Sequence, residues 1–159
     1  MSADQAGIYQ DLVRVYAAEC DFTGRWKPAA LFHHLTEAAH QHANRLGVGY
    51  EFMLPRGLYW VHARMRVRFF RLPGMAETVT IRTWPRGTRQ RLYYIRDFEL
   101  LDSAGSLLAA ATSAWLIIDA ATRRLLPASS APFELPAGSD RAALNEPLER
   151  LNLGAGGEE

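Results

Sequence analysis

The sequence has very little cysteine and no long hydrophobic run. Cys20 is the only cysteine among the 159 residues, so no disulfide can form within the chain, as is usual in a reducing compartment. No apolar run approaches the ~20 residues that a membrane-spanning helix needs. The opening residues, MSADQAG, lack the charged and then apolar plan of a signal peptide. We therefore expect a cytoplasmic protein with no membrane partner.

Charge and recognisable short motifs are also scarce. The net charge is +1, and Lys27 is the only lysine beside many arginines. A weak overall field without a binding motif argues against nucleic acid as a partner. No G-x-S-x-G elbow and no glycine-rich phosphate loop occurs, which excludes a serine hydrolase of that kind and a phosphate-loop enzyme. The length and the apolar content of 48% indicate one domain with a sizeable core.

One segment, residues 19–47, contains four of the five histidines. Pro28 suits a first helical turn and Gly47 a helix end, so we predict one long helix from Pro28 to about Leu46. Helical phase divides it into two faces. One face holds the apolar residues Leu31, Leu35, Ala38, Ala39 and Leu46, together with His42. The opposite face is polar and holds His33, Glu37, His40 and Asn44.

The remaining periodicity predicts antiparallel strands, at residues 8–17, 58–70, 78–84, 91–102 and 106–119. A loop is expected at 47–57, and Pro85 and Gly87 are expected to end the strand that begins at 78. In the strand at 58–70, alternation predicts two faces. Tyr59, Val61, Ala63, Met65, Val67 and Phe69 form one, and His62, Arg64, Arg66 and Arg68 form the other.

Residues beyond Pro127 are rich in Ala, Pro, Ser and Gly. We divide the chain into a domain at 1–127 and a partly disordered C-terminal extension at 128–159. A short helix near 140–151 is an option, and the final GAGGEE is expected to be disordered.

This order of elements, a long helix within a curling antiparallel sheet, resembles the α+β hot-dog fold. Residues 8–127 look like the N-terminal half of acyl-acyl-carrier-protein thioesterases. The stretches that carry the resemblance are LTEAAHQHANRLGVG (35–49), LYWVHARMRVRFFRLPGMAETVTIRTWP (58–85), RDFELLDSAG (96–105) and ATSAWLIIDAATRRL (111–125). The family implies hydrolysis of fatty acyl thioesters, as in fatty acid biosynthesis, without a metal or organic cofactor.

The resemblance covers one of the family's two hot-dog halves, and the family's catalysis is assigned to the other half. Its Asp-x-Asn-x-His type motif is absent from this chain. Single-domain hot-dog thioesterases instead place a catalytic Asp just before the central helix, where this chain has Asp21. A carboxylate there would face a carbonyl polarised by the free N–H groups of the helix start, around residues 28–31. A plain turn-forming role would also favour Asp at this position.

Glu37 is the second candidate for a catalytic base. His33 and His40 lie within reach of it on the polar face and would orient it. A hydrogen-bond network between subunits, or a metal site formed by the same three residues, are the alternatives. His34 and His42 are assigned to packing or the surface. Cys20 is a poor nucleophile candidate because no histidine is placed beside it by the sequence.

Arginines provide the expected docking surface. Arg64, Arg66 and Arg68 share one strand face, which would attract an acidic acyl carrier protein and its phosphate. An ordinary solvated sheet face is the alternative. Lys27 and Trp60 complete the expected substrate-binding residues. Trp60, with Trp84 and Trp115, would line a tunnel for the acyl chain, although core packing explains aromatic residues at strand spacing equally well.

The sequence thus predicts an acyl thioesterase that acts on acyl-carrier-protein or coenzyme A thioesters. We expect a homodimer or homotetramer, because pairing would cover an exposed sheet edge. Two other functions stay open. One is a hot-dog hydratase or dehydratase, which usually has a histidine where this chain has Lys27 and Pro28. The other is a non-catalytic acyl-carrier-binding protein.

Overall fold

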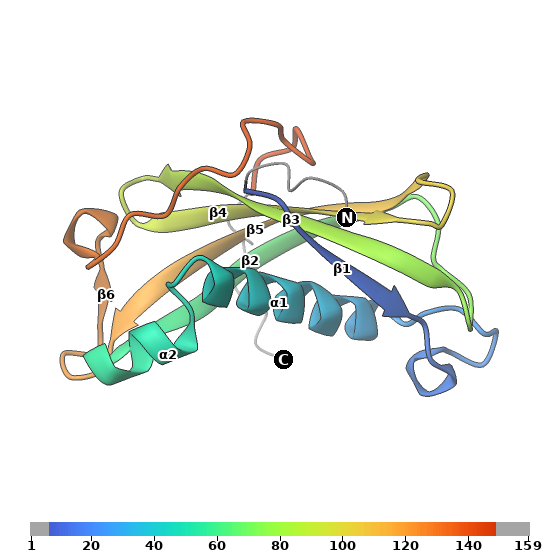
Figure 1. Cartoon of the computed structure of the whole chain (residues 1–159), viewed down its shortest axis with the longest axis horizontal. Coiled ribbons are helices and arrows are strands. Elements are labelled where there is room, and N and C mark those ends of the chain that lie inside the picture. Colours follow the sequence, from blue (N-terminus) through green and yellow to red (C-terminus); the bar gives the residue numbers. More distant parts are fainter. Residues whose placement is uncertain (1–6, 149–159) are drawn as a thin grey trace, which may run out of the picture.

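The computed structural model describes residues 7–148, which form one antiparallel sheet with a long helix across it (Figure 1). The sheet has the strand order β1-β3-β4-β5-β2, and a short β6 pairs with β5. The strands are β1 (Tyr9–Arg14), β2 (Leu58–Phe69), β3 (Thr78–Arg89), β4 (Tyr93–Leu101), β5 (Leu107–Asp119) and β6 (Arg124–Leu126). The predicted α+β class and the antiparallel sheet with its central helix are confirmed.

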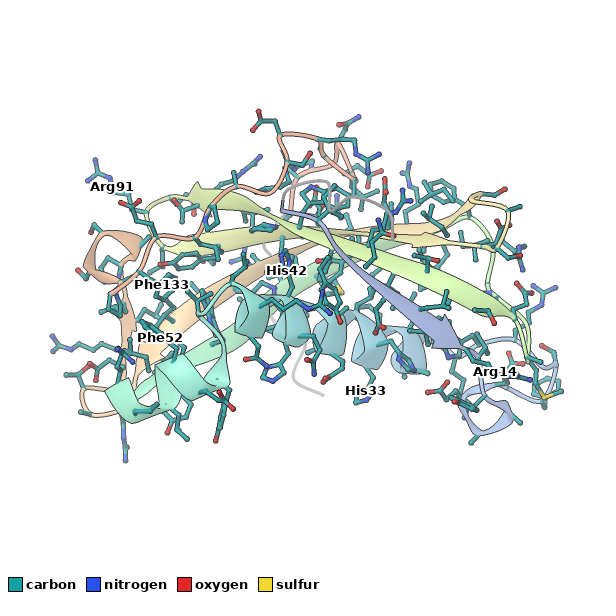
Figure 2. All side chains as sticks on the ribbon, viewed as in Figure 1. Arg14, His33, His42, Phe52, Arg91 and Phe133 are labelled. Atoms are coloured by element: carbon teal, nitrogen blue, oxygen red, sulfur yellow. The ribbon has the colours of Figure 1, made fainter. Side chains whose placement is uncertain are left out.

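Helix α1 (Pro28–Arg45) has the two faces that the sequence predicts. Leu31, Leu35 and His42 are buried against the sheet, whereas His33 and Glu37 are exposed. Figure 2 shows His42 pointing toward the sheet and His33 away from it. Each buried leucine contributes about 1.5–3 kcal/mol of transfer free energy, so this stripe holds the helix to the sheet.

Two faces of the sheet have different roles, and strand alternation assigns residues to them. On β4, Phe98 and Leu100 point toward α1 and belong to the main core, so we call this the inner face. Asp97 and Glu99, which alternate with them along the strand, point to the opposite, outer face. β5 opposes these positions with small residues, including Ala109 and Ala111, which let α1 pack close.

The predicted alternation along β2 is wrong in its first half. The register shifts between His62 and Arg64, so Ala63 is an extra, bulged residue. A bulge exchanges the two faces of a strand, and Trp60 and Met65 therefore share the inner face. His62 also lies on that face, where its ring stacks on Trp115 with centroids 4.4 Å apart. Of the four residues predicted on the polar face, only Arg64, Arg66 and Arg68, which follow the bulge, lie on the outer face.

Two other predicted boundaries need correction. β3 does not end at Pro85 but continues to Arg89, with an irregular register between Pro85 and Thr88. Proline is tolerated at such an irregularity because no ladder N–H is needed there. The predicted loop at 47–57 contains α2 (Tyr50–Met53) and the 3-10 turn η2 (Leu54–Arg56). Both are too short to produce a periodic pattern.

Short 3-10 turns also occur at η1 (Ala17–Glu19) and η3 (Ala128–Ser130). After η3, the extension runs over the end of the sheet and along its outer face (Figure 1). There Trp84 donates its indole N–H to the carbonyl oxygen of Arg141 at 3.0 Å, and Asp97 accepts the N–H of Ala143 at 2.7 Å. The described part of the extension is therefore packed on the sheet.

No helix is present over residues 140–148, so the predicted short helix is wrong across that part. The extension instead gains its hydrogen bonds from the sheet. The predicted disorder of GAGGEE falls outside the described residues, and the division at residue 127 stays a prediction. Among residues 7–148, no helix is long and apolar enough to cross a membrane.

Candidate functional site

A cavity of about 260 Å³ opens between the C-terminal half of α1, α2 and the inner face of the sheet. Ala39 and Ala43 leave space on the helix side, because neither side chain extends beyond Cβ. Trp60 and Tyr94 form the opposite wall, with ring centroids 4.9 Å apart and nearly perpendicular planes. Trp60 is fixed by its indole N–H, which donates to the carbonyl oxygen of Val48 at 2.8 Å. The cavity suits a small apolar ligand.

A charged side chain, Arg96, also lines this cavity. It is 6% exposed and lies on β4, where alternation directs it to the inner face. Its Nη1 donates to Nδ1 of His42 at 3.0 Å and to Oγ1 of Thr83 at 3.2 Å. Burial lowers the pKa of Arg96 to about 10, which leaves the guanidinium charged at neutral pH. The cavity therefore has one cationic wall.

His42 is the acceptor in this arrangement. Burial and the nearby charges of Arg96 and Arg45 lower the pKa of His42 to about 4. The ring is consequently neutral at neutral pH, and Nδ1 is free to accept a hydrogen bond from Arg96. Sequence phase placed His42 on the core face of α1, but it had no signal for Arg96, since β4 alternation alone does not predict a buried charge.

Asp21 lies in the turn that precedes α1 and does not line the cavity, which is formed by the other end of the helix. It is exposed, and its Oδ1 accepts hydrogen bonds from the Thr23 hydroxyl at 2.7 Å and from the N–H groups of Thr23 and Arg25. These bonds, led by the Thr23 hydroxyl, lower the pKa of Asp21. The carboxylate is thus ionised and held in the turn. Close by in the chain, Lys27 is exposed and donates from Nζ to the carbonyl oxygen of Ala18 at 3.1 Å.

Glu37 and the neighbouring histidines do not form a single network. Glu37 Oε1 accepts a hydrogen bond from Gln41 Nε2 at 2.6 Å, and His40 Nε2 lies 3.2 Å from the Asn44 amide nitrogen. Within residues 7–148, no three His, Cys, Asp or Glu side chains gather as metal ligands, so the alternative metal site is not formed. Of these polar residues, His40 lines the cavity.

A carboxylate–histidine pair that sequence reasoning missed lies at the start of α1. His34 Nε2 is 2.8 Å from Glu19 Oε1, and the Trp26 indole N–H donates to Glu19 Oε2 at 3.2 Å. Burial raises the pKa of Glu19, but the hydrogen bonds from His34 and the Tyr16 backbone lower it further, so the net pKa is below the usual value. Glu19 and His34 are 15 residues apart, a separation that no local motif detects.

The predicted arginine surface lies on the outer face, away from the cavity. Arg66 and Arg68 both pair with Glu146 of the extension, the Arg66–Glu146 distance being 3.4 Å. Arg64 instead lies over the ring of Tyr93, with its guanidinium carbon 5.3 Å from the centroid. Of the three tryptophans, Trp60 and Trp115 line the cavity, whereas Trp84 is on the outer face. The predicted contribution of Trp84 to a tunnel is therefore wrong.

A sequence profile described as the acyl-ACP thioesterase N-terminal domain matches residues 7–130. The chain belongs to this family. The match includes α1, the whole sheet and nearly all of the residues that line the cavity. Residues 131–148 of the extension lie beyond it.

Curated relatives of this family member come from plants. The chloroplastic oleoyl-acyl carrier protein thioesterase 2 of Arabidopsis thaliana is 38% identical over 69 residues, which are 43% of this chain and 18% of the relative. The chloroplastic palmitoyl-acyl carrier protein thioesterase of Cuphea hookeriana is 30% identical over 120 residues, 71% of this chain and 28% of the relative. The chain thus spans less than a third of the length of these relatives.

Solved structures show the same fold. The 12:0-ACP thioesterase of Umbellularia californica superposes with a TM-score of 0.75 at 26% identity, covering 91% of this chain and 57% of that one. An acyl-ACP thioesterase of Bacteroides thetaiotaomicron gives 0.72 at 25% identity, covering 82% and 57%. A DHNA-CoA thioesterase of Staphylococcus aureus gives 0.68 at 18% identity, covering 76% and 80%, and supports the hot-dog fold alone.

Proposed function

We propose that this chain is the acyl-binding unit of a thioesterase that hydrolyses acyl thioesters of acyl carrier protein or coenzyme A. The observation that carries the proposal is the aromatic-walled cavity beside α1, within a domain of the acyl-ACP thioesterase family. An acyl chain gains free energy by leaving water for such walls, and Ala39 and Ala43 give it room.

Hydrolysis also needs a base, and no Asp or Glu occurs among the described residues that line the cavity. We assign the base to Asp21, whose carboxylate is ionised and exposed before α1. Glu37, oriented by His33 and His40 once substrate is bound, is the second candidate. The backbone N–H of Ala29, in the first turn of α1, would stabilise the developing oxyanion, whereas the N–H groups of Ala30 and Leu31 already donate to the Lys27 carbonyl oxygen at 3.0 and 3.2 Å.

A homodimer would bring Asp21 to the cavity. β2 is an edge strand that pairs only with β5 among the described strands. Its residues 58–60 line the cavity near the end of α1, whereas Val67 lies beside Leu31 near the start. Antiparallel pairing of two β2 strands across a two-fold axis would therefore place the helix start of one subunit beside the cavity of the other.

The same pairing would cover a long exposed edge, which isolated sheets rarely leave open. It would also bring two of the expected substrate-binding residues to one site, with Trp60 in the cavity wall and the partner's Lys27 at the entrance. Arg64, Arg66 and Arg68 would attract the acidic carrier from the outer face of the same strand.

A heterodimer experiment tests this arrangement. Thiol release from acyl thioesters of several chain lengths would be measured for the wild type, Asp21→Asn, and Ala43→Trp, which fills the cavity. Each homodimeric variant should lose on the order of 10²-fold or more in rate. A purified heterodimer with one variant in each subunit retains one intact site, so it should regain about half of the wild-type activity. A heterodimer as inactive as its parents would refute the shared site.

The lack of a carboxylate in the cavity also favours a second candidate, a non-catalytic protein that binds acyl groups. This protein would bind acyl thioesters with no release of thiol above background at any chain length. Glu37→Gln separates the two candidate bases: if it alone abolishes hydrolysis while Asp21→Asn has full activity, Asp21 is excluded from the mechanism.

A further inference from the structure

Arg96 is a buried cation. Within residues 7–148, no carboxylate oxygen lies within salt-bridge distance of its guanidinium group. Asp97, the next residue, points to the outer face, where it pairs with Arg86 at 3.3 Å. The two groups that Arg96 does contact, His42 and Thr83, are both uncharged at neutral pH. Burying a charge in this way costs free energy that a bound anion would recover.

The Arg96 guanidinium group also has N–H donors that are not used in these two hydrogen bonds. Both described hydrogen bonds leave from Nη1, which leaves Nε and Nη2 without a partner among residues 7–148. Arg96 lines the cavity, so a ligand in the cavity meets this side chain. A guanidinium fork binds a carboxylate through two parallel hydrogen bonds, a geometry that a thioester or hydrocarbon cannot match.

Tyr94 lies on the same wall of the cavity, two residues before Arg96 on the inner face of β4. Its buried hydroxyl has no hydrogen-bond partner among residues 7–148. Side chains two apart on one strand face are neighbours. Both residues line the cavity, so a ligand beside Arg96 would also lie beside Tyr94.

We propose that Arg96 binds the carboxylate of a medium-chain carboxylic acid whose hydrocarbon part lies against Trp60 and Trp115. The proposal rests on the cavity being the acyl site of the proposed function. The carboxylate has two chemical sources: the free acid released by hydrolysis, or the distal end of a dicarboxylic acyl group. The cavity of about 260 Å³ is small, which favours a short or medium chain over a long one.

Calorimetric titration with octanoate and octanol tests the proposal without requiring any catalysis. Wild-type protein should bind octanoate at least tenfold more tightly than octanol at pH 7. Arg96→Met should lose at least tenfold in octanoate affinity with unchanged octanol affinity, since methionine keeps the cavity apolar. Arg124→Met, which removes an exposed arginine from β6, is the matched control and should bind octanoate as the wild type does.

Equal octanoate affinity in wild type and folded Arg96→Met would overturn the proposal. If Arg96→Met does not fold, the wild type alone decides the question. The carboxyl carbon of labelled octanoate is followed by NMR as pH falls. A cation beside the bound carboxylate lowers its pKa below that of free octanoate, and an equal or higher bound value would overturn the proposal.

Two kinetic measurements then distinguish the carboxylate sources. Competitive inhibition by octanoate that weakens at least tenfold in Arg96→Met identifies the product acid. A kcat/KM for an octanedioyl monothioester that exceeds that for octanoyl thioester, and loses this advantage in Arg96→Met, identifies a dicarboxylic acyl group. Octanoate binding without any thioester hydrolysis would refute the proposed thioesterase activity but support the proposed carboxylate site.

Discussion

The buried pair of His42 and Arg96 makes the stability of the fold dependent on pH. His42 is 5% exposed, its ring stacks on Tyr9 with centroids 5.7 Å apart, and Arg45 and Arg96 both place positive charge near it. Its pKa is about 4 in the folded protein and near the ordinary histidine value of 6.5 in the unfolded chain. Between pH 6.5 and pH 4, His42 is therefore protonated in the unfolded chain but not in the folded protein.

This difference destabilises the fold as pH falls from 6.5 toward 4. The difference between the two pKa values lowers the free energy of unfolding by about 3 kcal/mol at pH 4, because each pKa unit corresponds to about 1.4 kcal/mol. Above pH 6.5 both states are neutral at His42 and the contribution is complete; below pH 4 both are protonated and the loss stops growing. That loss is a large part of the stability of a typical small domain.

The assay is urea unfolding of the wild type and His42→Gln at several pH values. Glutamine does not titrate, and its carbonyl oxygen still offers Arg96 an acceptor. Other carboxylates also titrate in this range, so the quantity of interest is the difference in unfolding free energy between the two proteins. The wild type should lose about 3 kcal/mol relative to His42→Gln between pH 7.5 and pH 4. A constant difference would show that His42 is not buried as a neutral group.

Three other changes have defined outcomes. Ala43→Trp should lower octanoate affinity at least tenfold in calorimetry because the indole fills the cavity, and unchanged affinity would place the ligand elsewhere. Asp97→Ala should cost about 3 kcal/mol in urea unfolding and expose the extension to protease, since it removes the partner of Arg86 and of the Ala143 N–H; a cost below about 1 kcal/mol would contradict this anchoring role. Glu146→Gln should change stability by less than about 1 kcal/mol but strengthen carrier-protein binding at low salt, because it frees two arginines. Weaker or salt-independent binding would remove the arginines from docking.

Local pattern was sufficient wherever one element decides the outcome. The limits of α1 follow from Pro28 and Gly47, and the burial of Leu31 and Leu35 follows from a period of 3.6 residues. Alternation failed along β2, because a bulged Ala63 exchanges the faces and leaves no trace in composition. Trp60 was therefore predicted to line the acyl-chain tunnel, although the predicted alternation did not place it on the inner face.

The residues of the candidate site were also predicted only in part. His40 and Trp60, both named as site residues from the sequence, line the cavity. The functional roles of His40, Trp60, Asp21 and Glu37 stay predictions. The Glu19–His34 pair and the contact between Arg96 and His42 join residues 15 and 54 positions apart, and no local period relates them.

The sequence by itself determined the family, the central helix and its two faces, because these depend on periodicity and on long matching stretches. Only the tertiary structure decided which charges are buried and which pair. Arg96 on β4 and Arg66 on β2 are the same residue type in one sheet. Arg96 lines an apolar cavity, whereas Arg66 pairs with Glu146 on the outer face. Burial is a property of what packs above a residue, and that comes from distant parts of the chain.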